Sequence, residues 1–372
     1  MEATVPSSSK RIGQDLPGKG GELREGEKPG KWRTLRLTAL LLLLLIVFLS
    51  DIALGSVKIP LRQVFKILLS FRSENTTWQY IVEKIRIPKA FTAVLAGCGL
   101  SVSGLQMQTL FRNPLADPSV LGITAGASLG VAMIMLAGGS VATLYTIKEL
   151  GISGSWLIIA AACVGAASIM LLVLTISGTI KDNVMMLIIG VMIGTITLSV
   201  ISIWQYFSSP ELIKDYLLWT FGSLGGVNGN QLYLLMLAVA AGLILSFLSS
   251  KMLDALLLGE NYARSMGLTA QRARVIIICS TSLLAGSITA FCGPIGFIGI
   301  AVPHMARSLF NTSSHRILIP GCCLIGTVLM LLCDMIAQLP GSQTVLPINI
   351  ITALVGAPVV IWVTLHRNNI RG

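Results

Sequence analysis

The sequence predicts an all-α integral membrane protein with ten transmembrane helices. Its 372 residues are 54% hydrophobic and only 12% charged, roughly half the charged fraction of a soluble domain. The apolar residues gather in runs of about 20, the length at which a helix spans a bilayer. The run from Leu37 to Phe48 is almost unbroken, whereas the strands of a membrane barrel would alternate polar and apolar residues.

The apolar runs set the expected spans in chain order. We expect helices over residues 37–54, 90–111, 120–137, 154–177, 184–206, 231–250, 275–291, 296–310, 317–338 and 346–365. An even number of spans brings both ends of the chain to one side of the membrane. Glycines at helical spacing, such as Gly126 with Gly130 and Gly190 with Gly194, predict close packing between these helices.

Basic residues orient the predicted bundle, because Lys and Arg near helix ends stay mainly on the cytoplasmic side. Eight of the 27 basic residues lie before residue 37. We therefore expect residues 1–36 to form a basic, disordered cytoplasmic tail beside the lipid, and residues 37–372 to form the membrane domain. Both termini are then cytoplasmic, and the net charge of +11 predicts contact with a bilayer and not with nucleic acid.

The loop after the first span is an exception to this charge rule. It places seven basic residues on the outer side: Lys58, Arg62, Lys66, Arg72, Lys84, Arg86 and Lys89. An acidic partner explains such a cluster, and so does ordinary solvation with Glu74 and Glu83 nearby. Charge alone does not separate these two interpretations.

No catalytic or metal-binding constellation is visible. Gly13 to Lys19 matches part of a phosphate-binding loop, but Gly20 follows where Ser or Thr is needed, and no strand precedes it. The seven cysteines lack metal-ligand spacing, and His304, His315 and His366 fall at predicted cytoplasmic helix ends, where we expect solvated side chains. We expect a chain that is not an enzyme and binds no cofactor or metal itself. If ATP drives it, another subunit hydrolyses the ATP.

Polar residues interrupt the apolar sequence between Arg86 and Gly130. Gln106, Gln108, Arg112, Asn113 and Asp117 lie in or beside apolar runs, where an amide without a partner costs about 2 to 7 kcal/mol. Polar groups at this depth predict a translocation pathway or gate.

Two later features also break the apolar pattern. The segment from Pro294 to Arg307 is too rich in glycine and proline for one regular helix, which predicts either a structural kink or a broken helix beside a pathway. Asp334 is the one acidic residue deep within a predicted span after the first. It fits a proton or cation relay or a cap on a broken helix, and its isolation from a second carboxylate favours the cap.

The connection between the sixth and seventh spans, residues 252–274, predicts a short helix with a flat small face. Gly259, Ala263 and Gly267 recur every four residues, and Leu258, Tyr262 and Met266 form the next stripe. Such a face suits docking into a groove on a partner. An amphipathic helix lying on lipid is the alternative.

Several motifs together resemble one family. They are Arg86-Ile87-Pro88-Lys89, the segment from Gly104 through Asn113-Pro114-Leu115-Ala116-Asp117-Pro118 to Ile123, Gly126-Ala127, Gly222 to Val227, Leu258 to Leu268, Gly293 to Gly299, Val302-Pro303-His304 and Gly356-Ala357-Pro358. They resemble FecCD-type permeases of importers for iron-siderophores, heme and cobalamin. The match covers nearly everything from about residue 37 to the end.

The resemblance implies a type II ABC importer of the bacterial inner membrane. In it, two such permeases form a homodimer or heterodimer, with two ATPases that hold ATP and Mg²⁺ on one side and a substrate-binding protein on the other. It implies an ATPase-coupling loop with Leu258, Gly259, Glu260, Ala263, Arg264 and Gly267, and docking of the binding protein at Arg86 and Lys89. It further implies gate residues Asn113, Leu115 and Asn183, with Gln106 and Gln108 beside the path.

The implied cargo is a ferric siderophore, with heme or cobalamin as the alternative. A secondary transporter driven by an ion gradient through Asp334 is the alternative from another class. The chain departs from the family in two places: Gln338 follows Ala337 where an Arg is common, and Val345 to Asn349 replaces a Glu-Leu-Pro-x-Gly pattern. The docking geometry at that end is therefore expected to differ.

Overall fold

The computed structural model describes residues 29–55, 57–69, 75–137, 154–180, 182–338 and 345–368, which form helices and turns and no strand. In chain order the elements are α1 (Pro29–Ala53), α2 (Leu61–Leu68), α3 (Thr76–Tyr80), η1 (Ile81–Arg86), α4 (Ile87–Leu110), η2 (Pro118–Leu121), α5 (Ile123–Ala132), η3 (Met133–Ala137), α7 (Gly154–Thr179), α8 (Asn183–Phe207), α9 (Pro210–Thr220), α10 (Gly229–Leu248), α11 (Ser250–Leu258), α12 (Glu260–Ser265), α13 (Ala270–Cys292), α14 (Ile298–Phe310), α15 (His315–Ala337) and α16 (Ile348–Asn368).

Each predicted span corresponds to one of these helices, which confirms the all-α membrane class. Seven helices in the described ranges are long and apolar enough to cross a membrane. The three others are α5 with η3 and α14, which are shorter, and α16, whose apolar part is Ile348–Trp362. The break before α14 lies where the glycine and proline density predicts it, since Gly293 to Phe297 are not helical.

The expected tail boundary at residue 36 was wrong in its last part, because α1 already begins at Pro29. Proline suits the first turn of a helix, since the missing N–H has no partner there. Arg36 then lies inside α1 and donates to the carbonyl of Leu309 at 2.5 Å. The tail prediction for residues 1–28 lies outside the described residues, as does Arg72.

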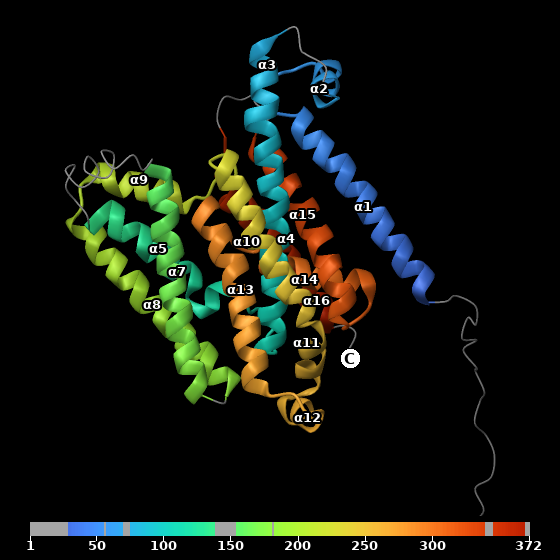
Figure 1. Ribbon diagram of the computed structural model, residues 1–372, viewed down its shortest axis with the longest axis vertical. Helices are drawn as coiled ribbons and strands as arrows, with labels where there is room; N and C mark the ends of the chain where they lie inside the picture. The colour runs from blue at the N-terminus through green and yellow to red at the C-terminus, as the bar shows by residue number, and fades with distance from the viewer. Residues whose placement is uncertain are drawn as a thin grey trace, which may run out of the picture.

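The helix that contains α4 runs through the middle of the molecule (Figure 1). It is continuous from Thr76 to Leu110, 35 residues, or about 52 Å at 1.5 Å per residue. This exceeds a hydrocarbon core of about 30 Å, so α3 projects beyond the neighbouring helices. α4 packs against α10, α13, α14 and α15, while α5, α7 and α8 form a second group, and α1 lies against α15.

Two glycine pairs lie at close helix approaches. A Cβ on Gly104 of α4 would lie 1.9 Å from the carbonyl oxygen of Gly299 in α14, and one on Gly126 of α5 would lie 2.6 Å from that of Gly165 in α7. A side chain at either position would therefore push two helices apart. The predicted use of small residues for packing is confirmed at Gly126.

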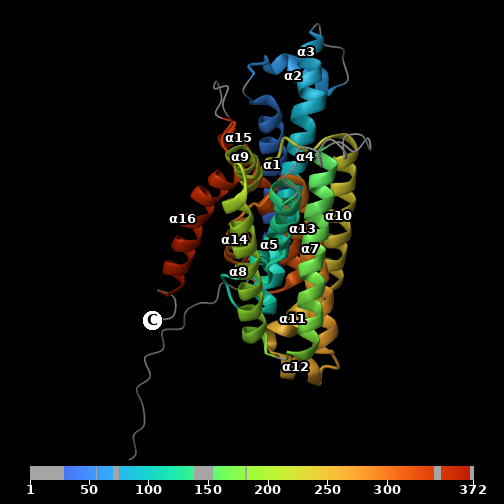
Figure 2. The same cartoon turned by 90° about the vertical axis from the view of Figure 1, so that its left-hand side faces the viewer.

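The connecting segments gather at two opposite ends (Figures 1 and 2). One end, called the α3 end below, carries α2, α3 and α9. The other, the α12 end, carries the start of α1, α11, α12 and the end of α16. The described start and end of the chain therefore lie toward the same side, as an even number of spans requires.

Candidate functional site: the helical unit and gate segments at the α12 end

Two short helices, α11 and α12, form one unit at the α12 end and meet at Gly259. The small-residue stripe predicted here was wrong. Gly259 has φ 122° and Gly267 has φ 81°, conformations that end helices, so both glycines flank α12 and do not lie in it. Ala263 is fully buried against the chain itself. The surface that the α11–α12 unit exposes is instead Leu258, Tyr262 and Met266, which are 66%, 51% and 50% exposed.

Asp254 anchors the α11–α12 unit to the membrane helices. Its carboxylate accepts from the backbone N–H of His315 at 2.8 Å and lies 2.6 Å from Nδ1 of the same residue. Nε2 of His315 in turn lies 2.8 Å from the Thr109 hydroxyl of α4. Burial raises the pKa of Asp254, but the bonds from His315 outweigh it and hold this pKa below its usual value.

Two histidines are buried and make contacts that the sequence did not predict. His304 and His315 are 8% and 0% exposed, so the expectation of solvated side chains was wrong for both. His304 Nε2 lies 2.9 Å from the carbonyl oxygen of Pro114. His304 thereby holds the predicted gate segment, and its place after Pro303 in an apolar run is the one signal the sequence offered.

The predicted gate residues Asn113 and Leu115 lie together in the turn after α4. The side-chain oxygen of Asn113 accepts from the backbone N–H of Leu115 at 3.0 Å, which is an Asx-turn. Leu115 is 52% exposed. Arg112, just before them, has φ 49°, a left-handed conformation in which glycine or asparagine is usual.

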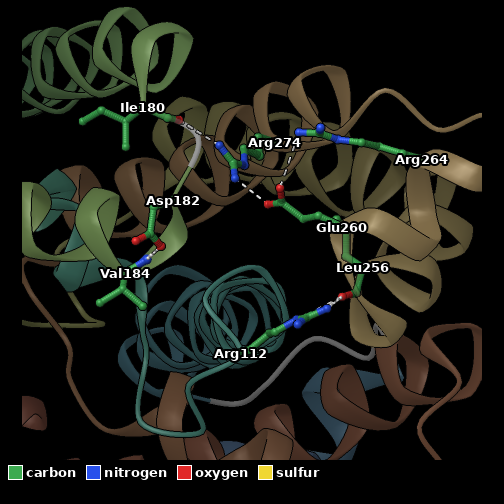
Figure 3. Close-up of polar contacts among 8 residues, drawn as sticks. All are labelled: Arg112, Ile180, Asp182, Val184, Leu256, Glu260, Arg264 and Arg274. Atoms are coloured by element: carbon green, nitrogen blue, oxygen red, sulfur yellow. Dashed lines mark hydrogen bonds and ion pairs between the residues drawn. The ribbon is translucent and has the colours of Figure 1, made fainter.

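The second predicted gate residue, Asn183, begins α8, where Asp182 caps the helix by accepting from the N–H of Val184 at 2.9 Å (Figure 3). The elements that follow the two gate segments pack together, because α8 lies on η2: a Cβ on Gly190 would lie 2.4 Å from the carbonyl oxygen of Val120. The side-chain oxygen of Asn183 is buried without a hydrogen-bond partner among the described residues. Whether either segment gates a path remains a prediction.

Gln106 and Gln108 are buried between helices of this chain. Gln106 accepts from the Thr281 hydroxyl of α13 at 3.0 Å. Gln108 donates to the carbonyls of Gly299 and Ile300 at 3.4 and 3.2 Å. The Gly299 carbonyl would otherwise lack its helical donor, because the residue four positions later is Pro303. Their predicted place beside a path remains untested.

A small cavity with both polar and apolar lining lies beside the broken helix before α14. Its volume is about 180 Å³, and its lining includes Asp117, Ser119, Gly296 and Asn349. Asn349 accepts from the N–H of Gly296 at 3.1 Å, so α16 holds the irregular backbone in place. The break in the helix is therefore both held in place by Asn349 and next to a cavity, so it fits the structural-kink and the pathway interpretations alike.

At the α3 end, Arg86 is bound to the chain's own backbone. It is 7% exposed and donates to the carbonyls of Ile52 and Ala53, both at 2.9 Å, and to that of Val57. The carbonyls at the end of α1 lack helical donors, so Arg86 caps this helix. Its predicted docking role stays a prediction, and the exposed basic residues at this end include Lys58, Arg62, Lys84 and Lys214.

Asp334 is not isolated, contrary to expectation. Lys89 lies 2.9 Å from its Oδ1, and Gln338 donates to its Oδ2 at 2.8 Å and to Asp51 at 3.3 Å. The cluster of Asp51, Lys89, Asp334 and Gln338 joins α1, α4 and α15. Lys89 is thus paired inside the chain, and its predicted docking role also stays a prediction.

Comparison with known proteins gives matches over most of the chain. The model of the FecCD transport family matches residues 42–366. The vitamin B12 import system permease proteins BtuC of Salmonella paratyphi A and Salmonella typhi are each 36% identical over 298 residues, which is 80% of this chain and 86% of theirs.

Solved structures share the fold. An inward-facing metal-chelate type ABC transporter matches with a TM-score of 0.77 and 26% identity, covering 90% of this chain and 99% of that one. PsaBC from Streptococcus pneumoniae, in complex with Fab, matches with a TM-score of 0.51 and 16% identity over 82% of this chain and 95% of that one. The second likeness concerns the fold alone.

Proposed function

The chain belongs to the FecCD transport family and is a multi-pass membrane permease of an ABC importer, and we propose that it imports a metal chelate, a ferric siderophore first, across the bacterial inner membrane. ATP hydrolysis takes place on a separate ATPase subunit, which holds the ATP and Mg²⁺. In this proposal the chain pairs with a second permease, two ATPases and an external substrate-binding protein. The α12 end is then cytoplasmic.

The observation that supports the ATPase contact is the exposed surface of the α11–α12 unit. Leu258, Tyr262 and Met266 are large apolar side chains at an end where the chain also carries many basic residues. The unit is held from the inner side by the buried Ala263 and by the bonds of Asp254 to His315. Its three exposed apolar side chains suit insertion into a groove on a partner. We propose that ATP-driven closure of the ATPase pair moves this unit.

The cargo has a second candidate. BtuC proteins, at 36% identity, are named for vitamin B12 import, which favours cobalamin as the alternative within the same class. Heme remains the third member of that class. An ion-gradient carrier using Asp334 is less well supported, because that carboxylate is paired with Lys89 at 2.9 Å and the family is one of ABC importers.

Uptake into proteoliposomes tests this function. The complex of this chain, its ATPase and its binding protein is given ferric siderophore, cobalamin or heme, with ATP or a non-hydrolysable analogue, and with ionophores that collapse ion gradients. We expect ATP-dependent uptake of ferric siderophore that survives the ionophores. Uptake of cobalamin or heme alone would replace the proposed cargo, and uptake that ignores ATP and fails with the ionophores would overturn the proposal.

A further inference from the structure

Two arginines connect the α11–α12 unit to the two predicted gate segments (Figure 3). Arg112 lies directly before Asn113 and contacts the end of α11, and Arg274 contacts both α12 and the turn that precedes Asn183. Neither contact follows from the apolar pattern of the sequence. Arg112 therefore joins the unit to a predicted gate segment as that segment's neighbour in the chain, and Arg274 does so through two side-chain contacts.

Arg112 holds an unfavourable backbone conformation in order to make its contact. A non-glycine residue is uncommon in the left-handed region, because its Cβ comes too close to the following carbonyl oxygen, and Arg112 has φ 49°. Its Nη2 and Nε donate to the carbonyl of Leu256, at 2.9 and 3.3 Å. This carbonyl lies in the last turn of α11, where it also accepts from the backbone N–H of Gly259 at 3.2 Å.

Gly259 makes room for this contact. A Cβ at this position would lie 3.0 Å from Nη2 of Arg112, and φ 122° already disfavours any side chain there. The same glycine separates α11 from α12. Gly259 therefore both separates the two helices of the unit and leaves the space that the Arg112 side chain occupies.

Arg274 is also placed against a local preference. It is the fifth residue of α13 and is only 2% exposed, although a charged side chain is rarely buried unless it is paired. Its Nη1 donates to the carbonyl of Ile180 at 2.9 Å, and its Nη2 pairs with Glu260 at the start of α12. Ile180 follows the end of α7 and lies three residues before Asn183.

We propose that Arg112 and Arg274 are positioning residues that transmit displacement of the α11–α12 unit to the segments of Asn113 and Asn183. The planar guanidinium group fixes direction as well as distance. A shift of α11 therefore moves Arg112 through the Leu256 carbonyl, and a shift of α12 moves Arg274 and the Ile180 carbonyl through Glu260. This inference rests on the proposed function, because it assumes that an ATPase moves the unit. Loss of either arginine should uncouple ATP hydrolysis from transport without dissociating the ATPase.

The test measures uptake and ATP hydrolysis together in proteoliposomes containing the full complex. Arg112→Gln and Arg274→Gln should each lower the uptake per ATP hydrolysed by about tenfold, within the usual range of coupling between sites. Co-purification of the ATPase should be unchanged. Arg112 is exposed, so Arg112→Gln should fold even if loss of the buried Arg274 charge does not allow folding.

A charge swap separates transmission from simple ion pairing. In Glu260→Arg with Arg274→Glu, the opposite charges still face each other, but a glutamate at 274 has no hydrogen to donate to the Ile180 carbonyl. We expect the ratio of uptake to hydrolysis to stay low in the swap. Restoration of the ratio would show that the ion pair alone matters and would overturn the role assigned to the Ile180 contact.

Matched controls remove an arginine without touching these links. Arg272→Gln removes an exposed charge from the same turn of α13, and Arg36→Gln breaks an arginine bond to a helix-end carbonyl at the same end. Both should keep the wild-type ratio. If the wild-type complex imports with ATP but Arg112→Gln keeps the wild-type ratio, the inference fails; if the wild-type complex shows no ATP-dependent uptake, the proposed function fails.

Discussion

At the α3 end, Arg86 binds carbonyls at the end of α1 and Lys89 binds Asp334, whereas at the α12 end Arg112 and Arg274 bind carbonyls at the ends of α11 and α7. All four are basic residues bound to their own chain. The first pair holds a loop and three membrane-spanning helices together. The second pair joins a peripheral helical unit to the turns beside it. We infer that basic residues stabilise the α3 end and transmit movement at the α12 end.

The largest effect on stability should come from Lys89→Met. It leaves the Asp334 carboxylate, 2% exposed, without its cation, and removing one partner of a buried pair costs about 3 to 5 kcal/mol. Thermal unfolding of the purified chain in detergent measures this loss. Lys58→Met, an exposed lysine at the same end, is the control.

A second substitution sharpens this result. Lys89→Met combined with Asp334→Leu should recover much of the lost stability, because an apolar pair often replaces a buried ion pair without loss. An unchanged unfolding temperature in Lys89→Met alone would contradict a stabilising role for the pair. The α3 end would then not be stabilised by charge.

The next largest effect should come from Arg86→Gln. A glutamine can keep at most part of the three carbonyl contacts, so we expect a loss of about 2 kcal/mol, as for hydrogen bonds from charged groups. The ATPase should still co-purify with this variant in the wild-type amount, because Arg86 lies at the opposite end from the α11–α12 unit. Arg62→Gln is the exposed control, and an unchanged unfolding temperature in Arg86→Gln would contradict a stabilising role for this arginine.

Gly267 distinguishes strain from docking at the α12 end. Its φ of 81° makes any side chain cost about 1 kcal/mol, and a Cβ there would meet no atom within 4 Å. Gly267→Ala should therefore lower stability slightly and still bind the ATPase. Gly267→Arg should carry the same strain but weaken ATPase binding by about tenfold or more, roughly 1.4 kcal/mol. Equal binding by both variants would argue against a partner at this surface.

The smallest effect concerns Asp254 and pH. Because His315 holds the pKa of Asp254 below its usual value, ionised Asp254 stabilises the folded chain above an unfolded pKa of about 3.9. This contribution is lost as the pH falls through the lower folded pKa. Asp254→Asn should cost under about 1 kcal/mol at neutral pH, as for a partly exposed pair. The variant should also lose less stability than the wild type when unfolding is measured from pH 6 down to pH 3, and identical pH profiles would contradict the assignment.

The helices were predictable because bilayer length and apolar runs set them. The span expected over residues 184–206 is α8, Asn183–Phe207, and no tertiary contact is needed to explain it. The short helices α2 and α9 were missed, since neither reaches the length at which apolar content alone identifies a helix. The prediction of a small-residue stripe at Gly259, Ala263 and Gly267 was wrong, because their spacing of four residues does not reveal that both glycines have a positive φ and lie outside the helix.

The sequence by itself determined the membrane class, the ten spans, the family resemblance and the break before α14, because each depends on residues close together in the chain. Only the tertiary structure decided what the polar residues bind. Arg274 meets Ile180 and Glu260, and Lys89 meets Asp334, across 94, 14 and 245 positions of sequence. Such partners are selected by helix packing, which brings buried charges and unpaired helix-end carbonyls together because neither can be left unsatisfied away from water.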